Sequence, residues 1–80
     1  MIDVYIPKMG MSTVEVDIMR VAVQPGQHVS LGEIVVEIES EKATLDIEAS
    51  GAGIVVEVLV QVGDVRQVGD VICRIQEDKS

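Results

Sequence analysis

The sequence lacks Phe and Trp, has one Tyr and one Cys, and contains 6 Lys and Arg residues against 14 Asp and Glu. The single cysteine, Cys73, cannot form an internal disulfide, which favours a reducing compartment. The formal net charge of −8 argues against nucleic acids and anionic membrane surfaces as partners, because both are negatively charged. Basic or mixed protein surfaces are the partners that this charge favours.

The sequence also lacks a recognisable targeting segment. Nothing near Met1 has the basic, apolar and small-residue order of a signal peptide, and no apolar run approaches the ~20 residues of a membrane span. A chain of 80 residues has little room for a catalytic cleft, because a domain this small buries only about 60% of its unfolded surface. We therefore expect one soluble domain, located in a bacterial cytoplasm with the mitochondrial matrix as the alternative, that is not an enzyme by itself.

Strands are the elements that the composition favours, since Val and Ile dominate the apolar residues and glycines fall between apolar runs. Period-two alternation is clearest over residues 34–39 and 43–49. Folding these runs into a hairpin with Glu41 and Lys42 at its tip pairs apolar residues throughout, and a loop of odd length would set apolar residues against acidic ones. The expected pairs are Ile38 with Leu45, Val36 with Ile47, and Ile34 with Ala49, with Val35 on the opposite face beside Glu37.

An internal repeat relates residues 23–39 to residues 60–76 at an offset of 37 positions. The identical pairs are Val23/Val60, Gln24/Gln61, Gly26/Gly63, Gly32/Gly69 and Ile38/Ile75. The repeat predicts an all-β fold: a flattened barrel or sandwich of two four-stranded antiparallel sheets related by a pseudo-twofold axis. The same offset carries Lys42 close to both chain ends, so the tip and the termini should lie at opposite poles of the domain.

Lys42 is the candidate functional residue. A lysine at a hairpin tip usually serves solubility, and that reading stays open on the residues alone. Two features favour a function. No Gly, Asn or Asp lies within three residues of the tip, although tight turns normally use them, and the expected pair Glu37/Asp46 sets like charges opposite each other at a cost in stability.

The motif Glu-Lys-Ala around Lys42 resembles the lipoyl attachment site of the biotinyl/lipoyl attachment family. Other segments resemble the family's first-strand ending and loop, its Pro-Gly turn and the repeat of that turn; these are residues 6–10, 23–29 and 60–64. The resemblance covers residues 2–76 and is greatest to the N-terminal lipoyl domain of a dihydrolipoamide acyltransferase. We expect residues 1–76 to form the domain and residues 77–80 to begin a linker or tail of a longer acyltransferase.

The resemblance implies that lipoate is amide-linked to Lys42 by a lipoate ligase or lipoyltransferase. The arm would carry acyl groups and reducing equivalents between a thiamin diphosphate-dependent 2-oxo acid dehydrogenase, the acyltransferase catalytic domain and dihydrolipoamide dehydrogenase. Partner recognition is expected of residues beside the lysine and in the first loop, namely Glu41, Ala43, Lys8, Met9, Gly10 and Met11. The alternative for that loop is an ordinary connection whose methionines cover the core. The isolated domain is expected to be a monomer without nucleic-acid or membrane partners.

Other functions fit the residues less well. Biotinyl domains characteristically have methionine on both sides of their lysine, where this chain has Glu41 and Ala43, and the hydrogen carrier of glycine cleavage is longer. Unmodified interaction modules of the same fold lack the lysine, and a Schiff-base enzyme would need a lysine with a depressed pKa, against its acidic neighbours. Cys73 is expected in the core, His28 at the surface or a strand end, and no metal site is expected.

Overall fold

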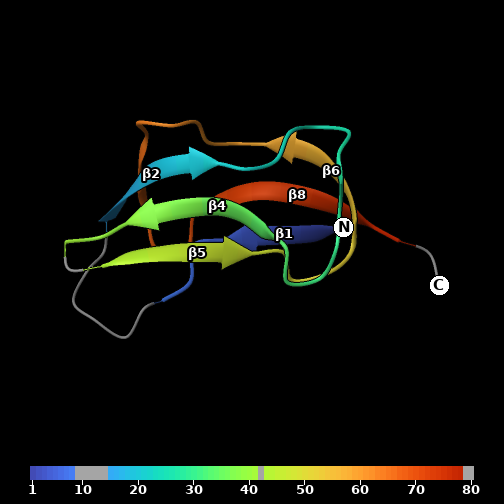
Figure 1. The fold of residues 1–80 in the computed structure, drawn as a ribbon, viewed down its shortest axis with the longest axis horizontal. Helices are drawn as coiled ribbons and strands as arrows, with labels where there is room; N and C mark the ends of the chain where they lie inside the picture. Colours follow the sequence, from blue (N-terminus) through green and yellow to red (C-terminus); the bar gives the residue numbers. More distant parts are fainter. Residues whose placement is uncertain (9–14, 42, 79–80) are drawn as a thin grey trace.

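The computed structural model describes residues 1–8, 15–41 and 43–78, which contain eight strands and no helix (Figure 1). The strands are β1 (Ile2–Tyr5), β2 (Glu15–Val21), β3 (His28–Val29), β4 (Ile34–Glu39), β5 (Thr44–Glu48), β6 (Gly53–Val58), β7 (Val65–Gln67) and β8 (Val71–Glu77). They form two four-stranded sheets with the orders β1-β8-β6-β3 and β5-β4-β2-β7, and all neighbours are antiparallel. No helix in this part of the chain is long and apolar enough to cross a membrane.

The two sheets repeat each other, strand for strand. Exchanging β1 with β5, β8 with β4, β6 with β2 and β3 with β7 converts one strand order into the other. The turns repeat as well: Gly26 and Gly63 have φ angles of +92° and +95°, a region that side chains other than glycine rarely adopt. Their N–H groups donate to the carbonyls of Val55 and Ile18, which are themselves 37 residues apart. The predicted fold and its pseudo-twofold axis are thus confirmed.

The core lies between the two sheets and is entirely apolar in the described residues. Val23 and Val60, an identical pair of the repeat, are both buried, as are Ile38 and Ile75. The largest side chains with almost no exposed surface come from both sheets and from the connection after β1: Ile6, Ile18, Ile38, Ile72 and Ile75. Burial of such branched side chains contributes about 1.5–3 kcal/mol each. The core between the two sheets is therefore the main source of stability.

The predicted β4–β5 register is correct at the tip and wrong at the far end. Ile38 pairs with Leu45 and Val36 with Ile47, but Ile34 lies opposite Glu48 and not Ala49, because the register shifts between Ile34 and Val36. Val35 and Val36 are consequently both buried, although Val35 was expected on the outer face. A bulge turns two successive side chains to one side, which a period-two pattern does not show.

The two chain ends lie at one end of the molecule, and β4 and β5 meet at the opposite end (Figure 1), as the repeat predicts. Two residues assigned to the tail belong to the folded part. Glu77 is in β8, the N–H of Asp78 donates to the carbonyl of Ala52 at 3.0 Å, and His28 Nε2 lies 3.0 Å from the Asp78 carboxylate. The boundary of the domain stays a prediction.

Cys73 lies in the core at the position that the repeat equates with Val36, and both side chains are fully buried. Burial raises the pKa of the Cys73 thiol from 9.0 to about 11. The unfolded chain therefore releases this proton at a lower pH than the native protein does. Thiol burial stabilises the fold fully below pH 9, and this contribution is lost as the pH rises towards 11.

We expect the free energy of unfolding to fall by about 2 kcal/mol between pH 9 and pH 11 because of this one thiol. The variant Cys73→Val, which copies Val36 of the other half, should lose that part of the pH dependence. Denaturant unfolding of both proteins from pH 8 to pH 11 measures the difference, since the remaining groups titrate alike in both. Parallel pH profiles would contradict the assignment.

Candidate functional site

The tip of the β4–β5 hairpin is closed by Ser40 and Ala43. The Ser40 N–H donates to the Ala43 carbonyl at 2.8 Å, and the Ser40 hydroxyl donates to the same oxygen at 3.1 Å. The ladder continues directly behind them with Glu39 opposite Thr44. Two residues, Glu41 and Lys42, therefore span the loop, as the alternation predicts. Ser40 was not predicted to have a role of its own, because its only signal was its place before the tip.

The structure describes some of the candidate residues and not others. Glu41 and Ala43 are both exposed beside the tip, and Lys42 itself lies outside the described residues. Lys8 is exposed in the segment after β1, a strand that runs toward the same end of the molecule as the β4–β5 turn (Figure 1). Met9, Gly10 and Met11 also lie outside the described residues, so the recognition role predicted for this loop stays a prediction.

Carboxylates cover the strands behind the tip. Glu37 lies opposite Asp46, and Glu39 lies opposite Asp17 across the β2–β4 ladder. Among the described residues, none of these four carboxylates is within ion-pair distance of a basic group. Like charges in directly opposed positions destabilise a sheet, so this acidic surface is retained at a cost.

The other sheet has a basic residue at the position equivalent to Glu37. Arg74, which the repeat equates with Glu37, lies between two carboxylates on neighbouring strands. Its Nε donates to Asp3 at 3.2 Å and its Nη1 donates to Glu57 at 2.9 Å. In the sheet behind the tip, Arg20 is the cross-strand neighbour of Glu37, but among the described residues the two are not within ion-pair distance.

Among the described residues, neither the cysteine nor the histidine lies at the tip. Cys73 is buried, His28 lies in β3 next to Asp78, and residues 1–8, 15–41 and 43–78 contain no group of three metal-ligating side chains. In the described part of the chain, the hydrogen bonds that close the tip come from the backbone and the Ser40 hydroxyl.

A family model described as "Biotin-requiring enzyme", covering biotinyl and lipoyl domains, matches residues 2–75. The chain belongs to the biotinyl/lipoyl attachment family. The match includes both halves of the repeat and the hairpin between them, so the family assignment concerns the domain as a whole. The predicted family and its role as a carrier domain are confirmed.

Relatives within the family are of two kinds. The dihydrolipoyllysine-residue succinyltransferase component of the 2-oxoglutarate dehydrogenase complex of Bacillus subtilis is 35% identical over 77 residues, which are 96% of this chain and 18% of that protein. The biotinylated protein TB7.3 homolog of Mycobacterium leprae is 41% identical over 58 residues, 72% of this chain and 82% of that protein. The chain therefore spans less than a fifth of the first relative and most of the second.

A solved structure establishes the fold independently. The lipoyl domain of the 2-oxoglutarate dehydrogenase complex from Azotobacter vinelandii superposes with a TM-score of 0.79 at 24% identity, covering 99% of this chain and all of that one. The superposition extends over both sheets, because nearly the complete chain is covered. The attachment-family domain described above thus has the fold of a lipoyl domain.

Proposed function

We propose that this domain carries a lipoyl group amide-linked to the Nζ of Lys42 and serves as the swinging arm of a 2-oxo acid dehydrogenase complex. The observation that carries the proposal is the loop closed by Ser40 and Ala43, which leaves Lys42 within a two-residue tip. Lipoyl domains of this family carry lipoate covalently on a lysine. Lipoate supplies the acyl-carrier and redox chemistry, and the protein supplies presentation and recognition.

The hairpin would present the amine rigidly and at a distance from the tether. Its register is set by the apolar pairs Ile38/Leu45 and Val36/Ile47, and slippage by one residue would expose the buried side chains. The chain ends leave from the opposite end of the molecule (Figure 1). A flexible linker attached there gives effective concentrations on the order of mM, so the arm visits successive active sites without diffusing away.

The partners we propose are a lipoate ligase or lipoyltransferase, a thiamin diphosphate-dependent 2-oxo acid dehydrogenase, an acyltransferase catalytic domain and dihydrolipoamide dehydrogenase. Support comes from the succinyltransferase component of Bacillus subtilis, of which this chain matches a part. Glu41, Ala43 and the loop with Lys8 are the residues proposed for recognition. We also propose a cytoplasmic location, with which the free thiol of Cys73 agrees.

Co-expression with a lipoate ligase and lipoate, followed by intact-mass measurement, tests this function. One lipoyl-amide increment per chain is expected. A known lipoyl domain expressed in the same cells reports whether the ligase is active. An unmodified chain beside a modified control would contradict the proposal and favour an unmodified interaction module.

Biotin carriage is the second candidate, because the Mycobacterium leprae relative is a biotinylated protein at 41% identity. The residues that flank Lys42 argue against it, since Glu41 and Ala43 stand where biotinyl domains characteristically have methionines. Parallel reactions with a biotin ligase and a lipoate ligase separate the two cargoes by mass.

The flanking residues themselves can be tested. We expect the double variant Glu41→Met/Ala43→Met to gain biotinylation at least tenfold, because both side chains are exposed at the tip where a ligase reads them. Quantitative avidin blotting against wild type measures the gain. The single variants control for the individual flanks, and an unchanged blot would show that ligase choice depends on other residues.

A further inference from the structure

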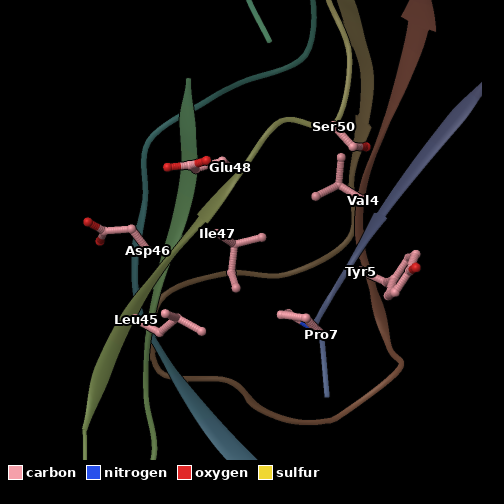
Figure 2. A pocket seen from close by; sticks show the side chains of 8 residues that line it. All are labelled: Val4, Tyr5, Pro7, Leu45, Asp46, Ile47, Glu48 and Ser50. Carbon is pink, nitrogen blue, oxygen red and sulfur yellow. The ribbon is translucent and has the colours of Figure 1, made fainter. Parts of the chain in front are cut away.

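An open apolar groove separates β1 from β5, the edge strands of the two sheets (Figure 2). Val4 and Ile47, which are almost fully buried, form its base, and Tyr5, Pro7 and Leu45 extend the apolar lining outward. Tyr5 is 57% exposed and Leu45 39%, so this lining is open to solvent. The remaining lining residues are polar and follow along the β5 side: Asp46, Glu48 and Ser50.

The groove runs along an unpaired strand edge. Among the described strands, β5 pairs only with β4, and β1 only with β8. The Ala43 carbonyl and the Ala49 N–H both bond toward the β4 side, to Ser40 and Glu33. Backbone groups alternate between the two sides of a strand, so the N–H and C=O groups of Asp46 and Glu48 point away from β4. No strand in the described part of the chain pairs with them.

The charges along this edge are also unmatched. No lining residue is basic, and neither Asp46 nor Glu48 lies within ion-pair distance of a base among the described residues. A second copy of this chain is a poor occupant, because antiparallel pairing of two β5 strands would oppose these carboxylates to each other. A basic occupant would be attracted.

We propose that the β5 edge and its groove dock an extended segment of a partner protein in which apolar residues alternate with lysine or arginine. Added as a strand, the segment pairs its backbone with β5. Its apolar side chains lie on the face of Leu45 and Ile47 and enter the groove, and its basic side chains lie on the face of Asp46 and Glu48. The docking surface does not involve modification of Lys42 and stands apart from the carrier function.

The unmodified domain and a short peptide in which valine alternates with lysine provide the test, followed by NMR of the backbone amides. We expect shifts confined to β1 and β5, and at least tenfold slower hydrogen exchange at the amides of Asp46 and Glu48. A peptide with glutamate in place of lysine should cause neither. Absence of shifts at millimolar peptide, or shifts on another face, would overturn the proposal.

Charge-neutral variants distinguish docking at the β5 edge from a general attraction of the basic peptide to the negatively charged domain. Asp46→Asn/Glu48→Gln should weaken peptide binding at least tenfold. The matched control Glu15→Gln/Asp17→Asn removes the same charge from β2, two strands away in the same sheet, and should retain the affinity within twofold. Equal losses of peptide affinity in both variants would show that binding depends only on the net charge of the domain, and would overturn the proposal. Concentration-dependent shifts of β5 without peptide would make a second copy the occupant and overturn the proposal as well.

Discussion

Lys42→Arg is expected to abolish attachment of the lipoyl group completely while the domain keeps its fold. Arginine retains the positive charge, but its guanidinium stays protonated and offers no amine for acylation. The loop is closed by Ser40 and Ala43, so the stability should change by no more than about 0.5 kcal/mol. Intact mass after co-expression with the ligase, together with a thermal melt, measures both effects.

The matched control is Lys8→Arg, which makes the same chemical change at the exposed lysine after β1. This variant should be lipoylated to the same extent as wild type, because the loop with Lys8 is proposed for recognition by the dehydrogenase and not by the ligase. A lipoyl increment remaining on Lys42→Arg would move the attachment site elsewhere. A large loss of stability would show instead that the side chain at position 42 supports the hairpin.

Gly53→Ala should strongly destabilise this domain. Gly53 lies at the start of β6 and pairs with both β3 and β8. A Cβ built there collides with the backbone carbonyl oxygen of Gln76 and lies 2.8 Å from Cγ2 of Ile75. Because the obstacle is backbone, the ladder to β8 must separate, and we expect a loss of about 3 kcal/mol or more in unfolding free energy.

Gly51→Ala, the same substitution two residues earlier in the chain, is the control. There the added Cβ meets only the Cδ1 end of the Ile2 side chain, which can rotate away. A change within about 1 kcal/mol is expected. Urea denaturation of both variants measures the contrast, and equal stabilities would show that the sheet absorbs the extra carbon at Gly53.

The layers of the fold could be predicted because the repeat places equal residues where equal backbone is needed. The pairs Gly26/Gly63 and Val23/Val60 mark the same turn and the same core position in each half, and the structure shows both pairs in equivalent roles. The tip register could be predicted because only an even loop keeps Ile38 opposite Leu45. These predictions succeed because they depend on local patterns.

What could not be predicted depends on contacts between distant segments. The bulge in β4 buries both Val35 and Val36, and the residue types of β4 do not indicate that a bulge occurs there. Asp78 looks like a tail residue, yet its backbone bonds to Ala52 and its side chain approaches His28. These partners of Asp78 lie 26 and 50 positions away in the sequence, so no local pattern near the chain end indicates the contacts.

The candidate site was predictable only in part. Alternation placed Lys42 between two strands, and resemblance to the attachment family assigned its cargo. The groove beside β5 was missed, because Tyr5 reaches it from β1, an edge strand of the other sheet, and showed no pattern of its own.

The separation of tip and termini has a mechanical consequence. The molecule is 39 Å long; β4 ends and β5 begins toward one end of it, and β1 begins and β8 ends toward the other (Figure 1). A flexible linker needs roughly 50 residues for a root-mean-square span of that length. In the proposed tethered carrier, the folded domain would therefore extend the reach of Lys42 by up to that length, and it would do so as a stiff body in place of such a linker.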